Sequence, residues 1–357
     1  MAQQTRTERG TMTDTPKQTH AGLPTLADVA ERAGVSTATV SRCLNSPDRV
    51  TKATRDRVEK AVRDLGYSPN FGARALAARR TGTVGAVIPT MENAIFARAL
   101  QAFQEELRDH GMTLLVASSG YSPEIEEEQI RTLVARGADA LLLIGHDRSE
   151  ELYHFLERHD VPVLVSWVHE KTALRPSIGF DNKKAMRALA DEVLKMGHRT
   201  IGVITAEQAG NDRARDRVEG VRAALASCDL PANDLAIIET PYSIENGRDA
   251  FARLMRRTPR PTAVICGNDV LAAGALQRAK EMNMHVPGDV SITGFDDIEI
   301  AILVDPPLTT VHVPHRAMGR QAARILIDVI RNGAPLLHSV ELSTDVRLRG
   351  TLGPPPA

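Results

Sequence analysis

The sequence predicts a small all-helical N-terminal domain followed by two α/β lobes, each a doubly wound parallel sheet. Between Thr25 and Gly66, apolar residues recur at helical spacing in three short segments. From Val84 onward, eight continuous apolar runs alternate with amphipathic stretches, which is typical of parallel strands covered by helices on both faces. The runs form two series, and 357 residues are enough for several domains.

The N-terminal domain, expected at 24–68, begins with two short helices. Thr25 is followed three residues later by Asp28, which predicts a capping box, and Gly34 ends the first helix. The apolar stripe of this helix is Leu26, Val29, Ala30 and Ala33. Ser36 caps the second helix, whose inner face is Val40 and Leu44.

The third helix is expected to start after Thr51 and to end at Gly66. Its apolar residues fall at positions i, i+3, i+4 and i+7, which are Val58, Ala61, Val62 and Leu65. The first two helices, joined by a short turn that contains Gly34, match the helix-turn-helix arrangement. From the pattern alone, another three-helix miniature domain stays possible as an alternative.

The second helix carries the features of a DNA-reading helix. With Val40 and Leu44 inward, its outward residues are Thr37, Ala38, Ser41 and Arg42. In helix-turn-helix domains such residues meet base edges in the major groove, where small side chains permit close approach and an arginine can bind guanine bidentately. Thr25, Ser36 and Thr51 are suited to phosphates, which position the protein without specifying sequence.

The charge distribution supports a nucleic-acid partner for this domain. Residues 24–80 contain eleven basic and six acidic side chains, a net charge of +5, whereas residues 81–357 carry −7. The whole chain has a formal charge of −1, which hides this asymmetry.

Two segments flank the helical domain. Residues 1–23 are polar and are expected to form a disordered tail. Residues 69–81 are expected to form a short helix and linker, in which Asn70 is a possible cap and Gly72 costs about 1 kcal/mol of helix stability relative to alanine. From the pattern alone, Leu76 belongs to an alanine-rich linker.

The elements of the two lobes follow from the alternating pattern. Strands are expected at 84–89, 113–118, 140–145 and 162–167, and in a second series at 200–205, 236–240, 263–267 and 291–295. Helices are expected at 96–110, 124–136, 183–196, 214–226, 245–257 and 269–282. Residues 309–314 are interpreted as a return crossing, which sends a helix at 315–332 to the first lobe and 339–351 to the second.

Ligands of open α/β sheets bind beyond the carboxyl ends of the strands, so two facing lobes predict a ligand cleft. The candidate residues lie just past strand ends and are Phe96, His146, Trp167, Arg217, Tyr242, Asn268 and Asp296. Aromatic faces can pack on the C–H side of a sugar ring, while Arg, Asn and Asp bind hydroxyl or carboxylate groups. Some of these and nearby residues have alternative, structural interpretations. Trp167 could belong to the core, His146 could be structural, and Asp181 and Asp297 could cap helices.

Several function classes are disfavoured. No run of eighteen uncharged apolar residues and no secretory signal is present, so a cytoplasmic protein without a membrane partner is expected. Cys43, Cys228 and Cys266 have no CxxC spacing, which argues against a disulfide framework and a metal site. The sequence lacks common nucleotide-binding and catalytic motifs, namely GxxxxGK[ST], HExxH, GxSxG and a GxGxxG after a strand. No cofactor and no catalysis are therefore expected. An enzyme or a sugar-binding protein without a DNA role is the alternative.

The helical domain also contains sequence motifs that resemble those of a known family. The domain resembles the headpiece of the lactose/galactose repressor (LacI/GalR) family over about fifty ungapped residues, in the segments TLADVAERAGVSTATVSRCLN, VTKATRDRV and LGYSPN. The resemblance implies that Thr37, Ala38 and Arg42 read bases. It places other side chains near phosphates, namely Thr25, Ser36, Thr39, Ser41, Thr51 and Asn70. It further implies a hinge helix at 69–81 that pairs with its dimer mate on the minor groove, where Leu76 is wedged between base steps.

The resemblance extends over residues 24–351. It implies an effector-binding and dimerisation core at 82–351, similar to periplasmic sugar-binding proteins, with lobes at about 82–180 with 314–336 and 181–312 with 337–351, and a tail at 352–357. Arg217 in RARDRVEG, Asn268 in CGND and Asp296 in GFDD match effector-contacting positions. NAIF (93–96) stands where the family often has NPFF, which implies that Phe96 closes one wall of the pocket, and Ala94 departs from the family pattern.

Within the family, the chain is most similar to the gluconate-utilisation regulators, in the segments SGYSPEIEEEQ, VSWVHE and SIGFDN. Val168 departs from this similarity, because that branch has an acidic residue at its position. This similarity implies a repressor of carbohydrate or sugar-acid genes that is released by its effector, with Arg217 or Arg215 facing a carboxylate. The partners implied are a pseudo-palindromic operator, a sugar or sugar acid, and a second copy of the chain. The C-terminal residues contain no leucine heptad for a tetramer, so a homodimer is expected.

Overall fold

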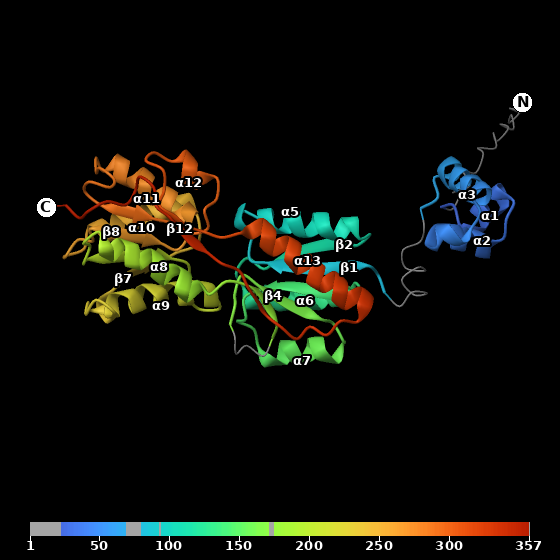
Figure 1. Cartoon of the computed structure of the whole chain (residues 1–357), viewed down its shortest axis with the longest axis horizontal. Coiled ribbons are helices and arrows are strands. Elements are labelled where there is room, and N and C mark those ends of the chain that lie inside the picture. Colours follow the sequence, from blue (N-terminus) through green and yellow to red (C-terminus); the bar gives the residue numbers. More distant parts are fainter. Residues whose placement is uncertain (1–22, 69–79, 93, 171–174, 357) are drawn as a thin grey trace, which may run out of the picture. The chain divides into compact units, whose positions relative to one another are not determined.

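The computed structural model describes residues 23–68, 80–92, 94–170 and 175–356. The chain divides into two compact units, residues 1–78 and 79–357 (Figure 1). The predicted tail and the predicted hinge helix, including Asn70 and Leu76, lie outside the described residues apart from the edges of those segments.

The N-terminal unit contains the three predicted helices, α1 (Leu26–Ala33), α2 (Thr37–Asn45) and α3 (Lys52–Leu65), with a 3-10 turn at Pro47–Arg49. The capping box of α1 is confirmed, because the Thr25 backbone N–H donates to Asp28 Oδ2 at 2.7 Å. Gly34 ends α1 in the left-handed region, with φ of 64°. The core of this unit consists of Val29, Ala30, Ala33, Val40, Cys43, Val58 and Ala61.

The first lobe contains a parallel six-stranded sheet in the order β11-β5-β4-β3-β1-β2. Its strands are β1 (Thr83–Ile88), β2 (Thr113–Ser118), β3 (Ala140–Ile144), β4 (Val163–Ser166), β5 (Ser177–Gly179) and β11 (Val340–Glu341). Helices α5 (Ala94–Asp109) and α13 (His315–Asn332) pack on one face, and α6 (Pro123–Ala135) and α7 (Glu150–Arg158) on the other.

The second lobe contains a parallel four-stranded sheet in the order β7-β6-β8-β9. Its strands are β6 (Ile201–Thr205), β7 (Ala236–Glu239), β8 (Ala263–Cys266) and β9 (Ser291–Thr293). Helices α8 (Asn182–Lys195) and α9 (Asp212–Ala226) cover one face, and α10 (Ile244–Met255) and α11 (Asp269–Glu281) the other. The short helix α12 is Ile300–Leu303, and a second 3-10 turn lies at Ala232–Asp234.

Within each lobe, paired helices touch backbone to backbone at a glycine. A Cβ atom on Gly319 of α13 would lie 2.0 Å from the Ala99 carbonyl oxygen of α5, and these helices lie side by side (Figure 1). On α11, a Cβ atom at Gly274 would lie 2.0 Å from the Ile244 carbonyl oxygen of α10. Real side chains do not occupy such distances, so only glycine permits this packing.

The described residues cross between the lobes three times, between β5 and α8, between β10 (Thr310–His312) and α13, and between β11 and β12 (Asp345–Arg347). β10 and β12 form a two-stranded antiparallel ribbon. A continuous hydrophobic cluster joins the α5 and α13 face of the first lobe to the α8 and α9 face of the second.

The structure differs from the prediction at the C-terminal end of the chain. The resemblance implies that residues 337–351 belong to the second lobe, but Val340–Glu341 pairs with β5 and extends the first sheet. The expected tail at 352–357 begins inside the core, because Leu352 is buried and the Gly353 carbonyl oxygen lies 2.8 Å from His198 Nε2. Among the described residues, no helix is long and apolar enough to cross a membrane.

Candidate functional site

The exposed face of α2 is the candidate DNA-reading surface of the N-terminal unit. Ser36 caps this helix by accepting from the Thr39 N–H at 3.2 Å, and the fully buried Val40 fixes its inner side. Thr37, Ala38 and Arg42 are exposed together on the outer side. Because the first two are small, the backbone of the first turn of α2 is open to close approach.

The residues expected near phosphates surround this helix. Thr25 and Ser36 are exposed at the N-termini of α1 and α2, and Thr39 and Ser41 are half-buried. Thr51 is exposed and is the N-cap residue of α3, as predicted, but its side chain makes no capping bond and its hydroxyl lies 3.0 Å from the Thr54 hydroxyl. Other exposed cations of this unit are Arg32, Arg49, Lys52, Arg57, Lys60 and Arg63.

In the second unit, six of the seven predicted ligand residues line one cavity between the lobes. This cavity, called the cleft cavity below, is small, about 20 Å³, which is room for one water molecule. Its lining residues are Ile95, Phe96, Tyr121, Trp167, Asn211, Arg213, Arg217, Tyr242, Asn268 and Asp296. A second cavity of about 310 Å³ adjoins it and shares Tyr121 and Tyr242, whose ring centroids are 6.0 Å apart.

Arg217 of α9 is the most heavily bonded of these side chains. Its Nε donates to Asn182 Oδ1 at 2.9 Å and its Nη1 to the Gly267 carbonyl oxygen at 2.6 Å. The guanidinium lies 3.8 Å over the Phe295 ring, and its Nη2 is 3.7 Å from Asp296 Oδ1. With the side chain only 7% exposed, Arg217 is held in one orientation before any ligand arrives.

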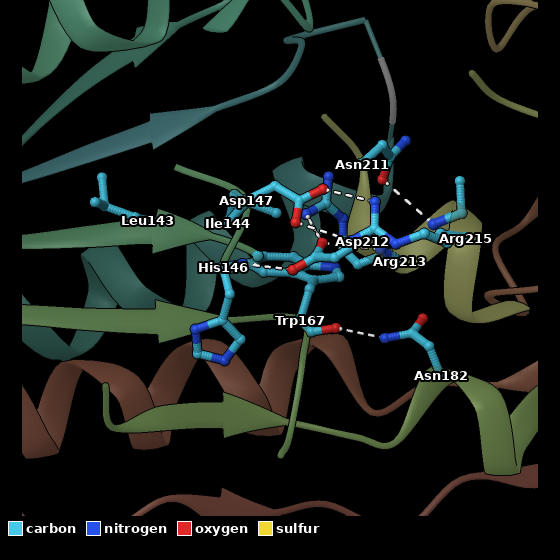
Figure 2. A network of polar contacts seen from close by, with 12 residues as sticks. Leu143, Ile144, His146, Asp147, Trp167, Asn182, Asn211, Asp212, Arg213 and Arg215 are labelled. Atoms are coloured by element: carbon cyan, nitrogen blue, oxygen red, sulfur yellow. Dashed lines mark hydrogen bonds and ion pairs between the residues drawn. The ribbon is translucent and has the colours of Figure 1, made fainter. Parts of the chain in front are cut away.

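The crossing before α8 is tied into this network. Asn182 is the first residue of α8 and donates from Nδ2 to the Trp167 carbonyl oxygen at 2.9 Å, as Figure 2 shows. Trp167 in turn packs its ring 5.1 Å from that of Phe96. One chain of contacts therefore connects Arg217 of the second lobe to the aromatic wall of the first.

The cleft cavity contains buried polar atoms that lack hydrogen-bond partners. These are Trp167 Nε1, Asn268 Nδ2 and both carboxylate oxygens of Asp296. The Asn268 amide is oriented by its other end, because Oδ1 accepts from the Leu271 N–H at 2.9 Å and caps α11. Burial raises the pKa of Asp296 to about 6, although Arg217 acts against this shift. An unpaired buried polar group costs roughly 1 to 3 kcal/mol, which a ligand with matching groups would recover.

Sequence reasoning missed four residues of the cleft cavity, namely Ile95, Tyr121, Asn211 and Arg213. Arg213 lies one helical turn before Arg217 on α9, and i,i+4 spacing places both guanidinium groups on one face of the helix. That spacing is a signal that was available in the sequence. Arg213 Nη1 donates to Asp212 Oδ1 at 2.8 Å (Figure 2).

His146 lies apart from the other six predicted ligand residues. It lines a separate cavity of about 610 Å³, and its backbone N–H donates to Asp212 Oδ2 while its ring points away from that contact (Figure 2). Burial lowers the pKa of the His146 imidazole. Arg215, the alternative partner for a carboxylate ligand, also lines this larger cavity and binds Asp147 through two contacts of 2.9 Å.

The two aspartates with alternative interpretations have structural partners. Asp181 accepts from the Lys184 N–H at 2.8 Å and caps α8, so the capping interpretation is confirmed. Asp297 caps no helix, because its carboxylate oxygens contact His312 Nδ1 at 2.9 Å and Arg349 Nη2 at 2.6 Å.

Comparisons with known proteins match both units. Residues 25–70 match the family model of bacterial regulatory proteins, lacI family, and residues 190–352 match a periplasmic binding protein-like domain. The HTH-type transcriptional repressor PurR of Vibrio atlanticus (strain LGP32) is 33% identical over 335 residues, which are 92% of this chain and 99% of the relative.

Solved structures agree over the same length. The Lac repressor dimer bound to operator and the anti-inducer ONPF has 26% identity and a TM-score of 0.81, and the match covers 92% of this chain and 99% of that one. The complex of the transcriptional regulator CelR with cellobiose has 29% identity and a TM-score of 0.67, with the same coverage. The chain therefore belongs to the lacI family of bacterial regulatory proteins and is a ligand-responsive, DNA-binding transcriptional repressor.

Proposed function

We propose that the protein is a cytoplasmic, non-enzymatic homodimer that represses carbohydrate or sugar-acid genes and is released from DNA by a gluconate-type sugar acid. The observation that carries this proposal is the cleft cavity, whose buried polar atoms lack partners in the described residues and face aromatic walls. A carbohydrate derivative supplies hydroxyl groups for those atoms and C–H faces for the rings.

The charge of the cleft cavity favours an anionic ligand. Two guanidinium groups, Arg213 and Arg217, line it against the single carboxylate of Asp296. The carboxylate of a sugar acid would therefore face Arg213 or Arg217, and its hydroxyl groups would bind Asn268 and Asp296. Arg215 is not a partner for it in this proposal, because it lines the larger cavity and not the cleft cavity.

The DNA-binding half of the proposal rests on α2. Thr37, Ala38 and Arg42 would contact base edges, and the hydroxyl groups around the helix would contact phosphates. The part of each chain that the structure describes contains a single helix-turn-helix, so a homodimer would read two half-sites of a pseudo-palindromic operator. The operator-bound dimer of the Lac repressor relative supports this arrangement.

The mechanism follows from the residues that join the lobes. A ligand in the cleft cavity would contact Trp167 from one lobe and Arg217 from the other, and so would favour one relative setting of the lobes. The coupling between ligand and operator is then a free energy of about 1 to 3 kcal/mol, and it acts in both directions. Operator DNA must therefore weaken ligand binding by the same factor by which the ligand weakens operator binding.

A thermal-shift screen of the full chain tests the ligand class. Gluconate is expected to raise the unfolding midpoint, since a ligand at one hundred times its Kd stabilises the native state by about 2.7 kcal/mol. Arg217→Met keeps an unbranched side chain but removes the guanidinium group over Phe295, and it is expected to abolish the shift. Glu128→Gln, on the exposed side of α6, is the matched control and should retain it.

Equal stabilisation by glucose, or stabilisation by a purine base alone, would overturn the sugar-acid assignment. Once a ligand is found, selection of operator DNA with and without it gives the sign of the response. Tighter operator binding in its presence would contradict release by the ligand.

A further inference from the structure

A pair of tyrosines, one from each lobe, lies where the cleft cavity meets the cavity of about 310 Å³, called the adjoining cavity below. Tyr121 and Tyr242 line both cavities, and their rings are tilted by 55° with centroids 6.0 Å apart. The cleft cavity, at about 20 Å³, is too small for a sugar acid. The adjoining cavity falls within the range of about 300 to 1,000 Å³ that is typical of small-molecule sites. A ligand therefore needs space from beyond the tyrosine pair.

The two tyrosines occupy equivalent positions in the two lobes. Each lies three residues after the end of an edge strand, Tyr121 after β2 and Tyr242 after β7. Each is followed by the serine that caps the next helix, Ser122 for α6 and Ser243 for α10. These serines accept from the backbone N–H three residues later, at 3.2 Å and 3.0 Å respectively. The helix caps therefore hold one aromatic ring from each lobe at the carboxyl edge of its sheet.

The backbone at Tyr121 is unfavourable for an aromatic residue. Its φ is 65°, in the left-handed region, where glycine and asparagine are preferred and a bulky side chain is strained. Burial offsets little of this strain, because the residue is 38% exposed. Strained backbone of this kind is concentrated at ligand-binding and other functional sites. The position of Tyr121, on the border of two cavities, agrees with a role in binding.

We propose that the ligand extends past the tyrosine pair and places a second sugar ring in the adjoining cavity, so that it is a glycosylated sugar acid. This inference rests on the proposed function, which places the acid group in the cleft cavity. Tyr121 and Tyr242 provide two aromatic faces, and each can pack on the C–H side of a sugar. Because the rings come from different lobes, a ligand that contacts both also joins the lobes.

The lining of the adjoining cavity suits a neutral sugar rather than a second anion. Pro241, Val270 and the two tyrosines provide apolar surface. Thr90 Oγ1 accepts from the Glu92 backbone N–H at 3.1 Å, so the hydroxyl hydrogen can be donated to a ligand. Glu92 is the only charged residue among the described residues that line this cavity, and its carboxylate can accept from sugar hydroxyl groups. The same carboxylate would repel an acid group, which the two guanidinium groups of the cleft cavity attract.

Isothermal titration of the full chain tests the proposal, with gluconate and with the glycosylated gluconates maltobionate, cellobionate and lactobionate as probes. At least one of the three is expected to bind tenfold more tightly than gluconate. Tyr121→Gly should reduce this preference at least tenfold. Since glycine also relieves the positive φ, this variant should unfold at no lower temperature than the wild type. Tyr121→Phe keeps the ring and should keep the preference.

Asp160→Gly is the matched control. It relieves a positive φ of 53° at an exposed residue before β4, at the amino end of that strand and away from the cleft. All four affinities should remain those of the wild type. A lower unfolding temperature of Tyr121→Gly would mean that the ring supports the fold rather than the ligand, and it would overturn the proposal.

The remaining outcomes separate this inference from the proposed function. If gluconate binds as tightly as all three glycosylated acids, the second sugar site is refuted and the sugar-acid assignment stands. If Tyr121→Gly weakens gluconate and the glycosylated acids by the same factor, the ring serves the cleft cavity alone, and the inference also fails. Absence of binding by all four acids would overturn the proposed function and, with it, the inference.

Discussion

The buried carboxylate of Asp296 predicts a specific pH dependence of stability. Asp296 is 0% exposed, its oxygens have no hydrogen-bond partner, and the nearest cation is Arg217 at 3.7 Å. The informative substitution is Asp296→Asn, which keeps the shape of the side chain but cannot ionise. Asparagine also tolerates the positive φ of 103° at this position.

The magnitude follows from the shift of the Asp296 pKa from 3.8 to about 6. Because the folded-state pKa lies above the unfolded one, the carboxyl favours folding most at low pH, and this contribution is lost as the pH rises through 6. The full shift corresponds to about 3 kcal/mol of unfolding free energy, of which about 2 kcal/mol is lost between pH 4.5 and pH 8. The wild type should therefore lose about 2 kcal/mol more than Asp296→Asn over that interval.

Urea unfolding at several pH values measures this difference. Trp167 is the only tryptophan and lies in the cleft cavity, so its fluorescence reports on the ligand-binding unit. Glu128→Gln is the matched control and should follow the wild type at every pH. Parallel curves for the wild type and Asp296→Asn would refute the reasoning, because they would mean that Asp296 ionises equally well in both states.

Two further predictions concern the DNA-reading helix and the helix pairs. Arg42→Ala should cost about 1 to 3 kcal/mol of operator affinity and relax the preference at one base pair, whereas Lys52→Ala should weaken all sequences alike; competition binding with single-base operator variants separates these outcomes. Gly319→Ala should destabilise the first lobe by about 1 to 3 kcal/mol, because its Cβ would meet the Ala99 carbonyl oxygen at 2.0 Å. Gly288→Ala, whose Cβ would meet no atom within 3.5 Å, is the control in thermal unfolding and should be nearly neutral.

The elements of the fold were predictable from the sequence because their patterns are strong. The predicted strands and helices of the lobes coincide with β1–β4, β6–β9, α5, α6, α8–α11 and α13 to within two residues. Short continuous apolar runs such as 140–144, which lie between amphipathic stretches, favour a buried parallel strand. The strand β11 was missed because two residues at a sheet edge carry no periodic pattern.

The candidate site was only partly predictable, for a geometric reason. The rule that ligands bind past the strand ends gives the correct edge of each sheet, and it identified Trp167 and Asp296. It does not say which side of a crossing a residue faces. His146 follows β3 at the same edge, yet the Asp212–Arg213 pair and the crossing at Asn182 separate it from the cleft cavity.

The glycine contacts between paired helices have a consequence for signalling. Backbones that touch at Gly319 and Gly274 cannot slide or separate without breaking close packing, so each lobe behaves as a rigid block. The adjustable parts among the described residues are then the three short crossings between the lobes. Ligand binding therefore cannot be transmitted by gradual deformation of a lobe. It is transmitted as a rotation of one rigid lobe against the other.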